Sequence, residues 1–320
     1  MMKQLILLVQ LLLLNPVTGF VSSGQSAPAL ITTKSAPQRQ QQLIRLQATK
    51  SNGGANVKNL LTANRATVDA LATEFPDVPE ITRLRFALAF STRAEVKRAL
   101  RDSVAFRRGA GRSLVDSAAK AYEQATSNGG WDNEAVRAAA PHSASINQFI
   151  TPKNIITLSA DNGDLVYVIR ASLINDRMLM NRVTVKQMGE FFLYVKEVHN
   201  IVADARSLQS GRLCEVIFAN DISGVRAIPD PRFSKALTES SKQYEKLYPS
   251  LAGPTMILNL PLVLQAFIGL IKPLFPTTVQ DRLKFKNAPV LARLKELTPL
   301  SSSNDRSRKA FLAEIQRLLR

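Results

Sequence analysis

The spacing of apolar residues changes character near residue 150. Over residues 81–140 apolar positions recur every three or four residues opposite Arg and Lys, which is typical of amphipathic helices. After Pro152, short β-branched runs alternate with longer helical stretches. We therefore expect a small helical lobe over 69–150, followed by an α/β domain over 151–300 with a mostly parallel sheet.

The boundaries of the elements follow from turn and cap residues. Asp77-Val78-Pro79-Glu80 favours a helix start, and Asp161-Asn162-Gly163-Asp164 favours a hairpin turn between strands Ile155–Leu158 and Leu165–Ile169. The elements expected after this hairpin are helix Val183–Ala205, strand Leu213–Ala219, helix Arg232–Leu247, strand Thr255–Leu260, helix Leu262–Ile271, strand Arg282–Lys286 and helices Val290–Leu297 and Asp305–Leu319. The last helix, in segment 301–320, is amphipathic, and we expect it to pack on the lobe rather than on a membrane.

The first 68 residues have a different composition. Lys3, an apolar run over 5–14 and the small residues Thr18-Gly19 predict a signal peptide over 1–19, since a membrane span needs about 20 apolar residues. Seven basic residues and no acidic residue lie before Asp69, so 20–68 is predicted to be a transit-peptide-like disordered leader.

With Phe20 at their junction, these two segments resemble the bipartite plastid presequence of algae with extra plastid membranes. This resemblance implies delivery to a plastid by the secretory route. The alternative is a secreted protein, or one of the endomembrane lumen.

Composition and motifs exclude several function classes. A single cysteine, Cys214, excludes an internal disulfide and a cysteine-cluster metal site, and two histidines leave little room for zinc chemistry. The net charge of +17 falls to +10 outside the leader, and aromatic residues are only 6 %, so we expect no nucleic-acid partner. The basic stretch Arg107–Arg112 follows a helix and lacks the spacing of a phosphate loop, so we interpret it as a loop between helices.

The sequence contains none of the common catalytic or cofactor motifs. Gly-x-Ser-x-Gly, Gly-x-Gly-x-x-Gly after a strand, His-Glu-x-x-His and Cys-x-x-Cys are all absent. We expect His199 to be a surface or hydrogen-bonded histidine and Cys214 to be inert within a strand. No spacing fixes the distance between Asp221 and Asp230, so we expect neither a catalytic set nor a cofactor.

The segment between Pro261 and Pro273 is apolar on nearly all sides. Over Leu262–Ile271, Gln265 and Gly269 are the only non-apolar residues, and this stretch is too short to span a bilayer. Such a helix is either an ordinary core helix or one that faces apolar material on both sides.

Several weak motifs occur in one order along residues 81–299. They are Leu84-Arg85-Phe86, Phe106-Arg107, Asn162-Gly163-Asp164-Leu165-Val166-Tyr167, Asn220-Asp221-Ile222-Ser223-Gly224, Tyr248-Pro249, Gly253, Asn259, Pro261, Lys272-Pro273-Leu274 and Arg282-Leu283. In type and order they resemble the CRAL-TRIO family, the lipid-exchange fold of yeast-type phosphatidylinositol transfer proteins and of tocopherol and retinal carriers. The resemblance implies an α/β/α domain in which a gating helix closes an apolar lipid pocket floored by the sheet.

The same resemblance implies roles for individual residues. The lipid-binding residues it implies are Val168, Val216, Phe218, Ile257, Leu264, Phe267, Ile268 and Ile271. Pro261, Gly269 and Pro273 would be the hinge positions of the gate. Arg93, Lys272, Arg282 and Lys284 would contact a headgroup or an anionic membrane surface.

Departures from the family pattern bear on the ligand. Phe90 and Ser91 stand where phosphoinositide-exchanging relatives carry a basic pair, and Val279 replaces a threonine. Val216 and Phe218 occupy positions that bind a choline headgroup in some relatives, and apolar side chains cannot satisfy a buried phosphate. We therefore expect a headgroup-poor lipid, such as a prenylquinone, a tocopherol, a carotenoid or a free fatty chain. The alternatives are phosphatidylinositol or phospholipid transfer, or a regulatory docking module, and nothing in the sequence indicates the oligomeric state.

Overall fold

The structure is a computed structural model. It describes residues 54–127, 131–224, 229–260, 283–288, 294, 296–300 and 306–319. The helices in this part are α3 (Val57–Glu74), α4 (Glu80–Ala89), α5 (Arg93–Arg108), α6 (Arg112–Thr126), α7 (Asn133–Ala138), α8 (Ser143–Ile146), α9 (Asp176–Met180), α10 (Val185–Ser210), α11 (Pro231–Leu247) and α15 (Arg306–Leu319). The strands are β1 (Ile155–Ser159), β2 (Leu165–Arg170), β3 (Val216–Asp221), β4 (Ala252–Leu258) and β5 (Leu283–Lys286), and short 3₁₀ turns cover Ala171–Leu173 and Thr298–Leu300.

The five strands form one sheet in the order β1-β2-β3-β4-β5. β1 and β2 are the predicted antiparallel hairpin, and β2, β3, β4 and β5 run parallel to their neighbours. Helices α10 and α11 make the crossovers from β2 to β3 and from β3 to β4, as parallel strands require. The predicted mixed α/β fold with a mostly parallel sheet is confirmed.

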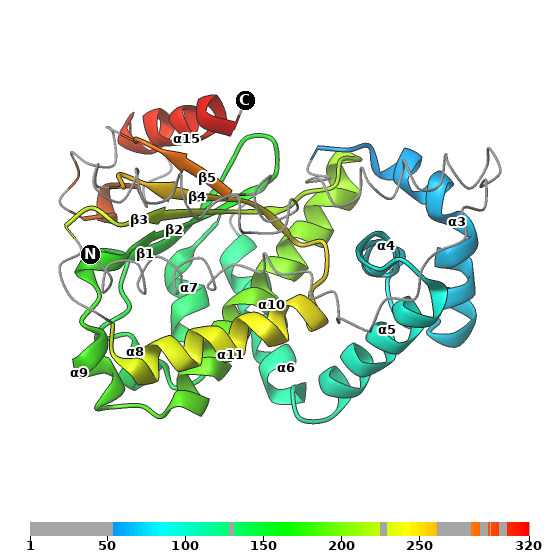
Figure 1. The fold of residues 1–320 in the computed structure, drawn as a ribbon, viewed down its shortest axis with the longest axis horizontal. Helices are drawn as coiled ribbons and strands as arrows, with labels where there is room; N and C mark the ends of the chain where they lie inside the picture. Colours follow the sequence, from blue (N-terminus) through cyan, green and yellow to red (C-terminus); the bar gives the residue numbers. More distant parts are fainter. Residues whose placement is uncertain are drawn as a thin grey trace, which may run out of the picture.

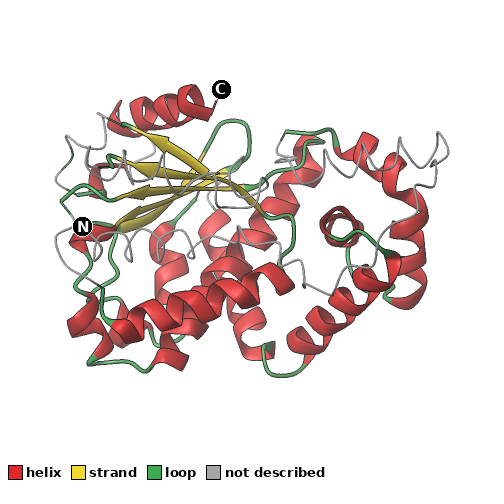
Figure 2. Cartoon of the chain, viewed as in Figure 1, coloured by secondary structure: helices red, strands yellow, loops and turns green. Residues whose placement is uncertain are grey.

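Helices cover both faces of the sheet (Figures 1 and 2). On the first face, Leu165, Tyr167 and Phe218 share a core with buried residues of α6, α10 and α11. On the second face, Val166 and Val168 share a core with buried residues of α15. Successive residues of a strand point to opposite faces, which explains why neighbours on β2 belong to different cores.

The helical lobe begins earlier than the sequence predicts. Helix α3 starts at Val57, where Asn56 accepts a hydrogen bond from the backbone N–H of Asn59, and its Val68 and Leu71 are buried. The predicted boundary at residue 68 therefore falls inside a helix. The prediction was wrong because it relied on the absence of acidic residues. A helix packs through regularly spaced apolar side chains, and those of α3 contact α4.

Helix α15 packs on the sheet rather than on the lobe. Its Phe311, Ile315 and Leu318 are buried in the core of the second sheet face. The sequence predicted that this helix packs on the protein, but on the helical lobe instead of the sheet. The sheet is the partner because the alternate residues of β2 and β3 make its second face apolar as well.

Two expected helices are not open to comparison. Helix 262–271 lies outside the described residues, as does most of helix 290–297. Within the described part, no helix is long and apolar enough to cross a bilayer.

Candidate functional site

The structure divides the predicted lipid-binding residues between the two faces of the sheet. Val216 and Phe218 lie on the face covered by α10 and α11, whereas Val168 lies on the face covered by α15. Ile257 of β4 pairs with Asn220 of β3. Two residues earlier on the same strands, Thr255 pairs with Phe218, so Ile257 lies on the same face of the sheet as Phe218. The structure therefore brings Val216, Phe218 and Ile257 onto one face and does not bring Val168 to them.

The other predicted site residues are distributed as follows. Arg93 is exposed at the first position of α5, and Lys284 is half-buried on β5, where it pairs with Met256 and shares the α15 face. The predicted residues that lie outside the described part of the chain are Leu264, Phe267, Ile268, Ile271, Lys272, Arg282, Pro261, Gly269 and Pro273.

A cluster of aromatic rings occupies the first face of the sheet. The ring of Phe218 makes edge contacts with Tyr167 of β2 and Tyr244 of α11, with centroids 6.1 Å and 6.5 Å apart. Tyr248 continues the cluster at 5.6 Å from Tyr244. These edge-to-face arrangements are the favoured geometry of aromatic pairs, so the cluster is a well-packed apolar surface.

Lys196 of α10 points into this cluster. Its Nζ lies 4.0 Å from the ring centroid of Phe218, 5.0 Å from that of Tyr167 and 4.9 Å from that of Tyr244. Burial lowers the pKa of Lys196 to about 7, because the charged form loses its water. The ammonium and amine forms of Lys196 are therefore similarly populated near neutral pH.

His199 lies one turn further along α10. Its Nε2 is 3.0 Å from the hydroxyl of Thr157 on β1, and its ring meets that of Tyr167 edge-on. Burial, with a smaller contribution from the charge of Lys196, lowers the pKa of His199 well below 6.5. The expectation of a hydrogen-bonded histidine is met at Nε2, and the ring is neutral at pH 7.

Lys196 was not among the residues predicted from the sequence, although its spacing along α10 carried a signal. Lys196 follows Phe192 by four residues and precedes Asn200 by four, so all three share one face of α10. All three side chains are buried, with Lys196 only 8 % exposed. A charged residue at a core position of a helix is a candidate for a functional role, because such a residue is costly to bury.

Two motif arginines of the helical lobe bind carboxylates of α10. Arg85 is 1 % exposed, and its Nε donates a 2.6 Å hydrogen bond to Asp204. Arg107 donates two hydrogen bonds, of 2.6 Å and 2.5 Å, to the buried carboxylate of Glu197. These pairs fix the lobe against the helix that carries Lys196, so their role is structural.

Asp221, the second residue of the Asn-Asp motif at the end of β3, is the centre of a buried polar network. Arg170 Nε and the Asn259 side-chain amide donate to opposite oxygens of Asp221, at 3.0 Å and 2.9 Å. Asp230, in contrast, accepts from Arg232 at the start of α11. The two aspartates therefore serve separate structural roles and do not form a carboxylate pair.

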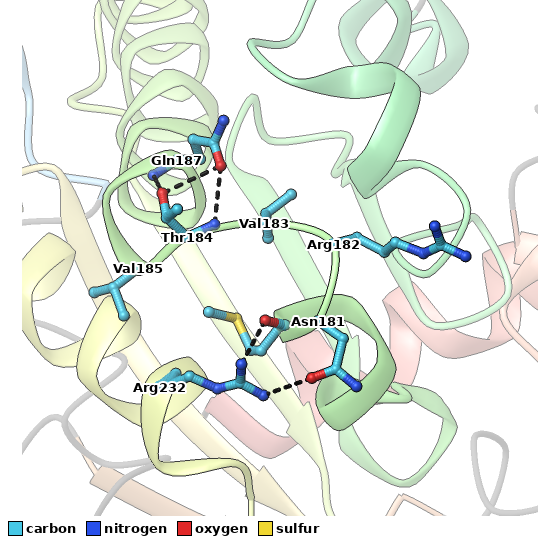
Figure 3. Close-up of a pocket in the computed structure, with 8 residues that line it drawn as sticks. Asn181, Arg182, Val183, Thr184, Val185, Gln187 and Arg232 are labelled. Carbon is cyan, nitrogen blue, oxygen red and sulfur yellow. Dashed lines mark hydrogen bonds between the residues drawn. The ribbon is translucent and has the colours of Figure 1, made fainter.

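An open cleft lies beside the start of α10 (Figure 3). Arg232 donates to the backbone oxygen of Met180 and to the side-chain oxygen of Asn181, and Thr184 and Gln187 form a reciprocal capping box. These polar groups already form hydrogen bonds with other groups of the protein, so we assign no ligand to the cleft. Its lining residues are Met180, Asn181, Arg182, Val183, Thr184, Val185, Gln187 and Arg232.

Fold and site together define a mostly parallel α/β domain with an apolar sheet face, where Lys196 is buried among aromatic rings. Residues 152–302 match the family model of the CRAL/TRIO domain. The match leaves out the helices before residue 152, and no curated protein matches the chain.

At the level of the family, the match indicates lipid binding and transfer, a function that is usually not enzymatic. Among the described residues, no group of three or more His, Cys, Asp and Glu side chains is placed to hold a metal ion. Cys214 is buried, and it lies just before β3 rather than within a strand as the sequence predicted.

Proposed function

We propose that this protein binds one hydrophobic lipid in an internal pocket and exchanges it with membranes, without catalysing a reaction. The observation that carries the proposal is the CRAL/TRIO match over 152–302. The apolar sheet face with Val216, Phe218 and Ile257 supports it, because buried apolar surface is what a lipid chain contacts favourably.

The ligand is a lipid with a small headgroup. The side chains of Val216 and Phe218 offer no hydrogen-bond donor, so these two side chains would not replace the hydration of a phosphodiester placed against them. A prenylquinone, a tocopherol, a carotenoid or a free fatty chain meets this condition, since most of its surface is apolar.

Exchange takes place at an anionic membrane surface. In this proposal the apolar segment 262–271 is the gate, with hinges at Pro261, Gly269 and Pro273. Its opening requires little free energy when the bilayer replaces the contacts of the bound lipid. Each basic residue close to an anionic bilayer contributes about 1 kcal/mol, and the proposed residues are Arg93, Lys272, Arg282 and Lys284.

The proposed destination is a plastid, reached by the secretory route. The support is the apolar run over 5–14, the acid-free stretch after it and Phe20 at their junction. In a plastid-bearing alga, the full chain with a C-terminal fluorescent tag should enter the plastid. Phe20→Ala should stop it in the endomembrane system. Secretion of the unchanged chain would contradict the proposal.

A transfer assay tests the lipid function. The purified full chain is mixed with donor vesicles and anionic acceptor vesicles that contain either a labelled prenylquinone or labelled phosphatidylinositol. We expect transfer of the prenylquinone and little transfer of phosphatidylinositol. Efficient transfer of phosphatidylinositol alone would overturn the ligand class, and transfer of neither would favour a docking module.

A further inference from the structure

Lys196 is a buried lysine with no anionic partner among the described residues. The side chain is 8 % exposed, and in the part of the chain that the structure describes no carboxylate forms an ion pair with it. Its neighbour Glu197 is already bound to Arg107, and Asp204 is bound to Arg85. The faces of three rings attract the ammonium, but they offer no acceptor atom for its three N–H donors.

A second unsatisfied group lies on the same face of the sheet. Asn220 follows Phe218 by two residues on β3, so both side chains point to the face covered by α10. Asn220 is 0 % exposed, and neither its Oδ1 nor its Nδ2 has a hydrogen-bond partner among the residues that the structure describes. Buried amides are nearly always hydrogen-bonded, so an amide with both atoms unpaired indicates a group that a ligand would satisfy.

Together these two side chains suit one small anion rather than a phosphodiester headgroup. The ammonium of Lys196 supplies a charge and the amide of Asn220 supplies an N–H donor, while Val216 and Phe218 supply no polar atom. A carboxylate ends a hydrocarbon chain with two acceptor oxygens and a single charge, which one ammonium and one amide can satisfy. A phosphodiester has the same charge but carries a further polar substituent, for which Val216 and Phe218 offer no partner. The remaining surface, including Ile257, is apolar and suits a hydrocarbon chain.

We propose that Lys196 and Asn220 bind the carboxylate of a long-chain carboxylic acid, which is the ligand class of this domain. This inference rests on the proposed function of lipid binding. The bound carboxylate would favour the ammonium form of Lys196, which burial alone disfavours.

Two ligands of equal chain length test the proposal. Binding of oleic acid and of oleyl alcohol to the full chain is measured by competition against a labelled prenylquinone. We expect the unchanged protein to bind oleic acid at least tenfold more tightly than the alcohol. Lys196→Met should abolish this preference without weakening the alcohol, and Asn220→Leu should reduce it. Lys186→Met is the matched control, because Lys186 is exposed on the same helix and should keep the preference.

The possible outcomes separate this inference from the proposed function. If Lys196→Met keeps the tenfold preference for oleic acid, the assignment of Lys196 is wrong although lipid binding stands. If the unchanged protein binds the prenylquinone but prefers neither oleyl compound, the carboxylate class is wrong. If it binds none of the three, the proposed function fails as well.

A spectroscopic measurement covers the case in which the variants do not fold. In the unchanged protein labelled with ¹⁵N-lysine, the Nζ signal of Lys196 should titrate near pH 7 in the absence of ligand. A saturating amount of oleic acid should raise this midpoint by at least one pH unit, and oleyl alcohol should not. An unchanged midpoint with bound oleic acid would overturn the proposal.

Discussion

The side-chain amide of Asn259 donates a 2.9 Å hydrogen bond to Asp221 Oδ1 and so joins the ends of β3 and β4. The other oxygen of Asp221 accepts from Arg170 Nε on β2, and the carboxylate is fully buried. One aspartate thus links three neighbouring strands where their carboxyl ends meet.

Loss of this carboxylate should destabilise the whole sheet. We expect Asp221→Ala to lower the free energy of unfolding by about 3–5 kcal/mol, because it removes one partner of a buried, hydrogen-bonded ion pair. Urea unfolding measures the change. Asp161→Ala is the control, since Asp161 is exposed on the hairpin turn and should change stability by less than about 0.5 kcal/mol. Equal effects of the two variants would contradict the structural role of Asp221.

Two adjacent arginines of α5 should differ in their contribution to stability. Arg107 is bound to the buried Glu197, whereas Arg108 and Asp77 form a pair in which both side chains are mostly exposed. Arg107→Ala should cost about 3 kcal/mol, since it leaves the carboxylate of Glu197 unpaired. Arg108→Ala should cost less than about 1 kcal/mol. Thermal and urea unfolding of the two variants provide the comparison, and similar losses would argue against the buried pair.

The stability of the protein should rise with pH above neutrality because of Lys196. Its pKa is about 7 in the folded chain and near 10.5 in the unfolded chain, so between these values the unfolded state binds one more proton. Stability should therefore increase between pH 7 and 9, with a slope that approaches about 1.4 kcal/mol per pH unit. His199 is neutral throughout this window, and the raised pKa of buried Tyr167 acts only above pH 10.

Substitution of Lys196 should remove that slope. Urea unfolding at pH 7, 8 and 9 should show a nearly flat profile for Lys196→Met. The control Lys186→Met should keep the slope of the unchanged protein, because its side chain is 87 % exposed. Parallel profiles for all three proteins would show that Lys196 retains an ordinary pKa.

Two glycines with left-handed backbone should respond differently to alanine. Gly163 has φ +92°, and a Cβ there would lie 2.9 Å from the sulfur of Cys214, while Gly211 has φ +69° and open space around it. Gly211→Ala should cost about 1–2 kcal/mol for the backbone alone. Gly163→Ala should cost at least about 1 kcal/mol more, because the sulfur must also move. Urea unfolding checks the order, and a larger loss for Gly211→Ala would contradict it.

The apolar pattern predicted most of the α/β domain, whereas it did not predict partners between distant segments. The turn at Gly163 and the alternation of β-branched runs were sufficient to place the hairpin and the parallel strands. The partner of α15 depended on which sheet face remained apolar, and that requires the register of the strands. The same limit applies to Val168, whose face is fixed by its position in β2 relative to Tyr167.

The candidate site was predicted only in its apolar part. Val216 and Phe218 were found because they occupy motif positions on one strand, and the structure places them on one face. Lys196 could not be assigned in this way, since its three aromatic neighbours come from β2, β3 and α11. Contacts between residues so far apart in the chain become visible only when the strands and helices are packed together.

The most direct test of lipid binding is native mass spectrometry of the purified full chain, followed by solvent extraction of the bound material. We expect a folded protein that carries one apolar, headgroup-poor lipid per chain. A phospholipid in the extract would contradict the ligand class. A folded protein that is empty and takes up no lipid from vesicles would contradict lipid binding itself.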